Sequence, residues 1–343
     1  MSPSIADLAP WLQTQLAALL RQRGHAWHLE GPSGLGQYEL GLALVQAWLC
    51  EAPTEAGACG VCGSCHLVDK HAHPDLAVLM PETVALDLGW PLSEKAQKEV
   101  DEKSRKPSKE IRVDAMRDTV GFAQRTSARG RGMAVLVYPA ERMNTETANS
   151  LLKTLEEPAG DTRLVLACEA THQLLPTVRS RCQSHAMIWP EETAALAWMK
   201  TQTTKKPLAD EALRTCLRAA GGRPSQALAW ALSGWDPKQW DALPGAMAKG
   251  DWSLLAQWSP AQQLDAMQKL CHDLMALASK APPRFFPVGS LPAMAPRWGA
   301  LARWSRDLMQ AARTVEHPYV PGLTQEAWAA RAKEVLAPAQ RAA

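Results

Sequence analysis

Apolar and polar positions divide the chain into two parts with different patterns. Up to about residue 190, short apolar runs of strand length alternate with stretches whose apolar residues recur at helical spacing. Strands that alternate with helices are typical of a parallel sheet covered on both faces, so this part predicts an α/β fold. Five strands are predicted, at residues 26–29, 75–80, 133–138, 163–168 and 185–189.

The ends of the predicted helices carry recognisable signals. Gly24 follows the first leucine-rich helical stretch, Asp114 has the side chain of an N-cap, and Pro158 terminates a helix because it cannot continue one. These signals and the periodicity predict helices at residues 5–23, 37–49, 114–128 and 145–157. A charged, apolar-poor stretch at 83–109 has neither pattern, and we expect it to be a mobile surface insertion.

From Pro190 onward the chain has no strand pattern and becomes helical, with many Ala, Leu and Trp residues. The change in composition predicts a domain boundary near 190. Gly, Pro and Asp cluster at 234–244 and predict a second break, and residues 281–296 have the composition of a loop. The second part is therefore expected to be all-helical and to contain two domains.

Composition is that of an ordinary globular protein. The 343 residues are 46% hydrophobic and 21% charged, and the net charge of +2 lacks the strong basic field of an autonomous nucleic-acid binder. The sequence has neither a secretory signal pattern nor an apolar run long enough to span a bilayer. We therefore expect a cytoplasmic protein without membrane partners, whose eight cysteines are reduced thiols or metal ligands.

The loop at 31–38 has the glycine positions of a phosphate-binding loop but lacks the side chains that bind phosphate and magnesium. A functional loop reads G-x-x-x-x-G-K-[ST], and here Gly31 and Gly36 keep the glycines. Gln37 replaces the lysine that neutralises phosphates, and Tyr38 replaces the hydroxyl that holds Mg²⁺. The loop therefore predicts a retained scaffold that does not bind ATP as an ATPase does.

A cysteine cluster follows the next predicted helix. Cys50, Cys59, Cys62 and Cys65 have the spacing C-x8-C-x2-C-x2-C, with a glycine directly after two of them. This spacing predicts a tetrahedral four-thiolate zinc site, which is closed to water and therefore structural. One alternative is four reduced cysteines without a metal, and the other is an iron–sulfur cluster. The nearby histidines are not expected to be ligands.

Arg179 and Arg181 stand between a helical turn and the last predicted strand. A guanidinium at such an edge could act in trans on the triphosphate of a neighbouring subunit, as an arginine finger does. A structural ion pair with Glu156, Glu157 or Glu169 is the alternative, and spacing alone does not separate the two.

Four features together resemble a known family. The degenerate loop, the four-cysteine knuckle, the run NSLLKTLEEP at 149–158 and the triplet SRC at 180–182 occur in this order in bacterial clamp-loader subunits of the AAA+ class. The last two motifs are shared with the ATP-hydrolysing gamma/tau subunits. The loss of the lysine and hydroxyl from the loop makes the chain similar to the delta-prime group of that family.

The resemblance also assigns the other ATPase positions. It aligns Tyr138 and Pro139 with the carboxylate pair that binds magnesium, Cys168 with the sensor threonine, and Ser225 with the sensor arginine of the lid, with Arg223 displaced by two. None of these aligned residues could do the work of the residue it replaces. Arg181, by contrast, matches the trans-acting finger, so the resemblance implies a subunit that completes a neighbour's site.

The architecture implied by the resemblance has three parts. An AAA+ domain at 1–188 carries the five-stranded parallel sheet and a zinc lobe at about 50–66, and is followed by a helical lid domain at 189–234 and a helical collar domain at 235–343. The expected partners are gamma/tau and delta subunits in a hetero-pentameric ring, with the sliding clamp and primed DNA reached through the complex.

The predicted function is that of a non-hydrolysing stator without polymerase or nuclease residues of its own, within a DNA polymerase holoenzyme. An ATP-hydrolysing gamma/tau-type subunit is the first alternative. The second is an autonomous DNA-binding module built from the zinc knuckle and the basic segment 125–131, against which the near-neutral charge argues.

Overall fold

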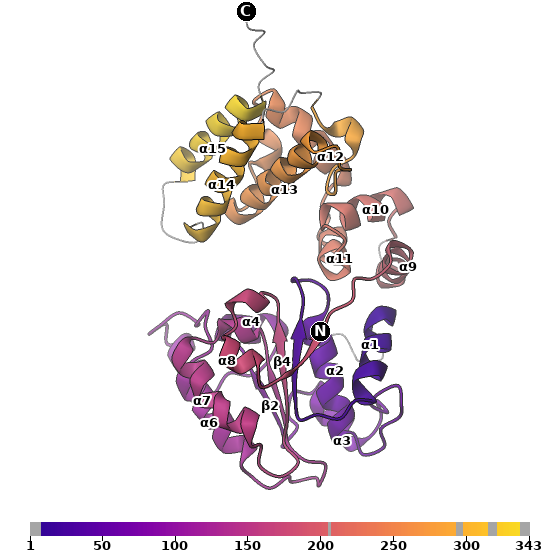
Figure 1. Cartoon of the computed structure of the whole chain (residues 1–343), viewed down its shortest axis with the longest axis vertical. Coiled ribbons are helices and arrows are strands. Elements are labelled where there is room, and N and C mark those ends of the chain that lie inside the picture. The colour runs from indigo at the N-terminus through magenta and orange to yellow at the C-terminus, as the bar shows by residue number, and fades with distance from the viewer. Residues whose placement is uncertain (1–7, 205–206, 293–297, 315–320, 337–343) are drawn as a thin grey trace, which may run out of the picture. The chain divides into compact units, whose positions relative to one another are not determined.

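The structure is a computed structural model that describes residues 8–204, 207–292, 298–314 and 321–336. The chain forms two compact units, Met1–Trp198 and Met199–Ala343, which are coloured indigo to magenta and salmon to yellow in Figure 1. The first unit is α/β and the second is helical over its described residues. Within the described part of the chain, no helix combines the length and apolarity needed to cross a membrane.

The first unit is built on a five-stranded sheet with the order β2-β3-β4-β1-β5. All neighbouring strands are parallel, which confirms the predicted sheet. The connections that this order requires are made by helices on its faces. The strands are β1 (Ala26–Glu30), β2 (Leu76–Leu79), β3 (Ala134–Val137), β4 (Arg163–Cys168) and β5 (Gln183–Ala186).

The predicted position of the last strand was wrong. The prediction of 185–189 followed the apolar residues, but β5 pairs with β1 from Gln183 to Ala186 and is mostly exposed at the sheet edge. An exposed edge strand need not be apolar, because backbone pairing sets its register. Ile188 and Trp189 lie beyond the strand and remain largely exposed.

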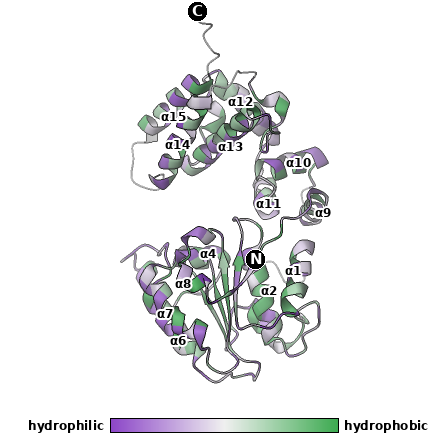
Figure 2. Ribbon diagram, in the orientation of Figure 1, coloured by the Kyte–Doolittle hydropathy of each residue, from purple (hydrophilic) through white to green (hydrophobic). Residues whose placement is uncertain are grey.

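Two helical layers cover the sheet. The helices α1 (Pro10–Leu20) and α2 (Gln37–Leu49) pack on one face, and α6 (Val113–Ala123) and α7 (Thr145–Glu156) pack on the other (Figure 1). Figure 2 shows hydrophobic residues concentrated along the strands and α2, which is buried over most of its length. The predictions for α2 and α7 are confirmed, and residues 5–7 of the predicted first helix lie outside the described residues.

The helix predicted at 114–128 starts and ends elsewhere. Arg112 is the N-cap residue of α6, Asp114 lies in its first turn, and the helix ends at Ala123. The carboxylate of the buried Asp75 accepts hydrogen bonds from the backbone N–H groups of Ala128 and Arg129 at 2.6 and 2.9 Å. These bonds hold the segment as a loop, so the basic residues near Arg129 do not continue the helix.

The charged stretch at 83–109 is more structured than predicted. It contains α4 (Glu82–Leu88) and α5 (Glu94–Asp101). The guanidinium of Arg105 pairs with Glu82 at 2.7 Å and with Glu99 at 2.6 Å, and so joins both helices. The apolar residues Val84, Ala85 and Leu88 also pack α4 against the core of the first unit. The sequence did not predict this order, because the ion pairs of Arg105 join residues far apart in the chain.

The second unit has a core rich in tryptophan. Trp240 and Trp304 are 1% exposed, and Trp240 stacks on Phe286 with 4.5 Å between the ring centres. The boundary between the two units falls within α9 (Glu192–Gln202). The remaining described helices are α10 (Asp210–Ala219), α11 (Pro224–Ser233), α12 (Pro237–Ala248), α13 (Pro260–Ala278), α14 (Trp298–Thr314) and α15 (Pro321–Leu336).

The break predicted at 234–244 is shorter in the structure. Gly234 ends α11 in a left-handed conformation with φ of 82°, but α12 already begins at Pro237 and includes Pro244. Proline at the first helical position is favourable, since its missing N–H would have no partner there. The separation of a lid at 189–234 from a collar at 235–343 stays a prediction.

Asp75 provides a test of how residues 125–131, which we call the basic loop, are held. Burial alone would raise the pKa of Asp75, but hydrogen bonds from Ala128, Arg129 and Ser127 outweigh it and keep the pKa below its usual value. The carboxylate therefore stabilises the fold above its unfolded pKa, and this contribution is lost as the pH falls through the folded pKa. Asp75→Asn should cost about 1–3 kcal/mol in urea unfolding at neutral pH. Asp87→Asn, on an exposed position, is the control, and equal stability of both variants would contradict this role.

Candidate functional site

The glycine loop lies where β1 ends and α2 begins. Gly36 is left-handed with φ of 96°, and a Cβ there would come within 2.6 Å of Leu12, so the turn and the packing both require glycine. The buried side chain of Gln37 donates from Nε2 to the carbonyls of Gly31 at 2.9 Å and Pro32 at 2.8 Å. The residue at the lysine position is thus turned back into the loop, and both amide protons are used.

An aromatic cluster forms around Tyr38 and Tyr138, which the family resemblance aligns with magnesium-binding positions. The hydroxyl of Tyr38 accepts a hydrogen bond from Trp90 Nε1 at 2.6 Å, and its ring lies 5.3 Å from that of Tyr138. Tyr138 in turn donates to Glu169 at 2.8 Å. The loop residue and the residue directly after β3 therefore pack on each other.

Both phenols are neutral. Burial raises the pKa of Tyr38 to about 12 against the opposing effect of Trp90, and burial followed by the charge of Glu169 raises the pKa of Tyr138 further. Neutral phenols are poor ligands for magnesium, which prefers carboxylates and water. The arrangement offers no charged group of the kind that ATP hydrolysis requires at these two positions.

The other residues that the resemblance aligns with ATPase positions lie at or near the ends of secondary-structure elements. Glu141 is the carboxylate next in the chain after Tyr138 and Pro139, and it accepts the backbone N–H of Glu169 at 3.1 Å. Cys168 ends β4, where burial and then the Glu141 carboxylate raise its pKa to about 12. In the second unit, Arg223 is the N-cap residue of α11, just ahead of Ser225.

Trp90 is a member of the aromatic cluster that sequence patterns did not indicate. It reaches the hydroxyl of Tyr38 from 52 positions away in the chain. No local motif connects two residues at that distance, so only the folded structure identifies the contact.

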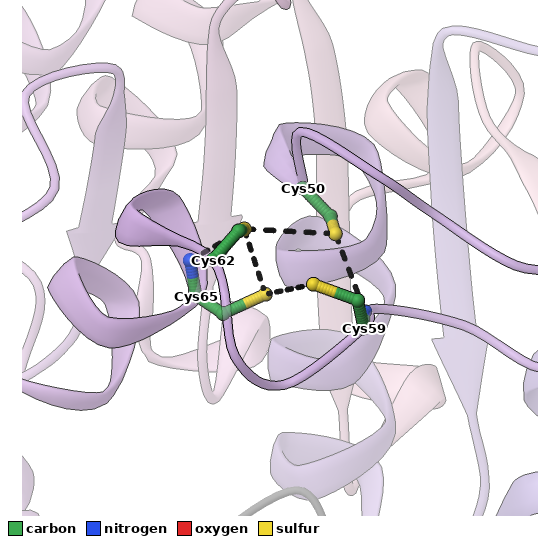
Figure 3. A group of neighbouring side chains, drawn as sticks. All are labelled: Cys50, Cys59, Cys62 and Cys65. Atoms are coloured by element: carbon green, nitrogen blue, oxygen red, sulfur yellow. Dashed lines mark hydrogen bonds between the residues drawn. The ribbon is translucent and has the colours of Figure 1, made fainter.

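The four cysteines come together as predicted. Their sulfur atoms lie within 4.8 Å of one another, with separations of 3.8 Å for Cys50–Cys62, 3.9 Å for Cys59–Cys65 and 3.5 Å for Cys62–Cys65. Figure 3 shows the sulfurs turned toward a common centre. Zinc–sulfur bonds of about 2.3 Å in a tetrahedron place sulfurs about 3.8 Å apart, so the cluster fits a four-thiolate metal site.

Backbone geometry supports the same cluster. The N–H groups of Cys59 and Cys65 donate to the sulfurs of Cys50 and Cys62 at 3.2 and 3.4 Å. Such bonds stabilise thiolates, the form in which cysteine binds metal. Two of the nearby histidines have contacts elsewhere: His71 stacks on Trp90, and His73 Nδ1 accepts the N–H of Asp75.

The cysteine lobe is fastened to the sheet domain. Cys62 is the N-cap of α3 (Gly63–Asp69), and the buried Gln46 of α2 donates to the Cys65 carbonyl and to Asp69. Arg129 of the basic loop donates to Ser64 at 2.9 Å and to Glu51 at 2.5 Å. The lobe therefore ties α2, α3 and the basic loop together. The Arg129 contacts could not be anticipated from the sequence, because the partners lie 65 and 78 residues away.

Arg181 follows the short helix α8 (Pro176–Arg179). Its Nε donates to Glu156 at 2.6 Å, its Nη2 also pairs with Glu156, and its Nη1 donates to the Thr177 carbonyl at 2.8 Å. One of the ion pairs considered from the sequence is thus present. The side chains of Arg181 and Glu156 remain 32% and 50% exposed, so the pair stays in contact with solvent.

Comparison with known proteins gives consistent results. The sequence model of the family described as "DNA polymerase III, delta subunit" matches residues 10–188. A DNA polymerase III subunit delta' of Pseudomonas aeruginosa is 39% identical over 222 residues, or 64% of this chain and 60% of that protein. The subunit delta' of Escherichia coli is 32% identical over 256 residues, or 72% of this chain and 69% of that protein.

Similarity extends to another subunit type. The DNA polymerase III subunit tau of Escherichia coli is 28% identical over 158 residues, which cover 46% of this chain and 20% of that protein. The chain spans less than two thirds of the length of the Pseudomonas aeruginosa relative.

Metal removal tests the cysteine cluster. We expect about one zinc per chain by elemental analysis, and loss of that zinc in Cys59→Ser together with a fall of several degrees in Tm. Cys216→Ser, at a buried cysteine of the second unit, is the control and should keep the metal. An equal Tm for the metal-bound protein and the chelator-treated protein would contradict a structural role for the metal. Bound iron with absorbance in the visible range would instead indicate an iron–sulfur cluster.

Nucleotide titration tests the loop. Calorimetry of the isolated chain with Mg-ATP should show no saturable binding at submillimolar concentrations. The double variant Gln37→Lys, Tyr38→Thr should also fail to bind, because Tyr138 and Pro139 still supply no carboxylate, and it should melt at a lower temperature after losing the bond to Trp90. Tight, magnesium-dependent binding by the unaltered chain would overturn this interpretation.

Proposed function

The chain belongs to the family of DNA polymerase III delta' subunits, and from this premise we propose that it is the non-hydrolysing stator subunit of a bacterial sliding-clamp loader. The observation that carries the proposal is the closed nucleotide loop, in which Gln37 bonds to Gly31 and Pro32. An ATP-hydrolysing role of the gamma/tau type is disfavoured because Tyr38 and Tyr138, which the resemblance aligns with magnesium-binding positions, pack on each other.

Arg181 is proposed to act on the site of a neighbouring subunit. Its guanidinium is partly exposed at the end of α8 and is oriented by Glu156 and the Thr177 carbonyl. Exposed ion pairs contribute only about 0–1 kcal/mol, so a triphosphate can displace Glu156 at little cost. Glu156 would then hold the finger ready while the neighbouring site is empty.

The remaining parts of the proposal follow from family membership. Gamma/tau and delta subunits would complete a hetero-pentameric ring in the cytoplasm, and the sliding clamp and primed DNA would be reached through that ring. The domains at 1–188, 189–234 and 235–343 would serve as AAA+ domain, lid and collar. Zinc held by the four cysteines would be structural, because a closed thiolate shell leaves no position for water.

Reconstitution of the clamp loader tests the finger. Loss of a trans-acting arginine typically lowers hydrolysis at the affected site by about 10³ to 10⁵-fold. Arg181→Ala should therefore silence one site of the ring and impair clamp loading, while the other sites still turn over. Arg117→Ala removes an exposed arginine from α6 and serves as the matched control.

The variant Glu156→Gln separates the orientation of Arg181 from its proposed effect on ATP hydrolysis. It removes the charge that holds Arg181 but keeps the guanidinium, so we expect a much smaller loss of ATPase than in Arg181→Ala. Unchanged ATPase and clamp loading in Arg181→Ala, or an equal loss in the Arg117→Ala control, would refute the finger assignment.

A further inference from the structure

A large basic cavity lies at the edge of the sheet opposite the glycine loop. Its volume is about 1130 Å³, and its walls come from the end of α1, from α2, from the cysteine lobe and from the segments that precede β3 and begin β4. The strands are parallel, so this amino-terminal edge is remote from the loop that follows β1. The proposed stator function uses no residue of this cavity.

Four arginines dominate the charge of the cavity lining. They are Arg21, Arg23, Arg131 and Arg163, and the lining also includes the carboxylates Glu55 and Asp161. Within residues 8–204, none of the four guanidiniums lies at ion-pair distance from a carboxylate, whereas Arg105, Arg129 and Arg181 are all paired. Since all four are exposed, the cavity presents a local excess of positive charge on a chain with net charge +2.

An aromatic wall accompanies these charges. Trp48 is partly exposed, and the guanidinium of Arg163 lies 5.6 Å from the centre of its ring. Trp27, which is 2% exposed, also lines the cavity. Guanidiniums bind phosphate oxygens through pairs of N–H groups, and a guanidinium stacked on indole offers a flat surface to a nucleic-acid base.

We propose that this cavity binds the sugar–phosphate backbone of a single-stranded nucleic acid. Small-molecule sites usually enclose about 300–1,000 Å³, and this cavity is larger and open to solvent. Its guanidiniums also come from three separate segments of the chain, which suits several successive phosphates better than one. The contact is local, which agrees with a chain that lacks an overall basic field.

Fluorescence anisotropy with labelled oligothymidylate tests the site on the full chain over a series of salt concentrations. Arg21→Ala, Arg23→Ala is the informative double variant, because both side chains lie past the end of α1 and are exposed. It should weaken binding and make the log–log salt dependence shallower by about 0.7 for each phosphate that the variant no longer neutralises. Lys95→Ala, Lys98→Ala removes the same charge from α5 and is the control.

The outcomes decide between specific alternatives. Thermal melting establishes that each variant folds, and retained ATPase of the reconstituted complex with the arginine variant separates this site from the finger. An equal weakening of binding in the lysine control would overturn the proposal, because it would reflect net charge alone. Competition by pyrophosphate at concentrations matched in phosphate would overturn the strand as ligand and indicate a small phosphate compound instead.

Discussion

The proposed function depends first on the hydrogen bonds from Gln37 to the carbonyls of Gly31 and Pro32. They close the loop between β1 and α2 with one of its own side chains. Because the next residue, Tyr38, packs against Tyr138 and bonds to Trp90, the closure continues to the end of β3. In the proposed stator, the sheet keeps the AAA+ fold, while Gln37, Tyr38 and Tyr138 contribute to packing.

Some arginines of the first unit stabilise its fold, and others are accessible to an anionic ligand. Arg105 and Arg129 have structural roles. Arg105 joins α4 to α5 through ion pairs, and Arg129 connects the cysteine lobe to the basic loop. Arg181 is held by a solvent-exposed pair that competes weakly with phosphate. Arg131 and Arg163 line a cavity and, among the described residues, have no carboxylate at ion-pair distance. Arg181, Arg131 and Arg163 therefore remain accessible to an anion in a way that Arg105 and Arg129 do not.

Much of this could be predicted from the sequence where the signal is local. The strand 163–168, the helix 37–49 and the cysteine spacing each depend on neighbouring residues, and the structure agrees with them. Predictions were wrong where distant contacts decide: Asp75 holds the segment after α6 as a loop, Arg105 joins α4 and α5 through ion pairs, and β5 takes its register from β1. Nothing in the sequence indicated that Trp90 would complete the aromatic cluster.

A crystal structure of the isolated chain soaked with a magnesium complex of a non-hydrolysable ATP analogue is the sharpest test of loop closure. We expect the Gln37 amide to stay on the carbonyls of Gly31 and Pro32, the Tyr38 and Tyr138 rings to remain in contact, and the loop to hold no phosphate. A triphosphate seated in the loop, with the Gln37 side chain turned outward and magnesium bound beside Tyr38, would contradict closure.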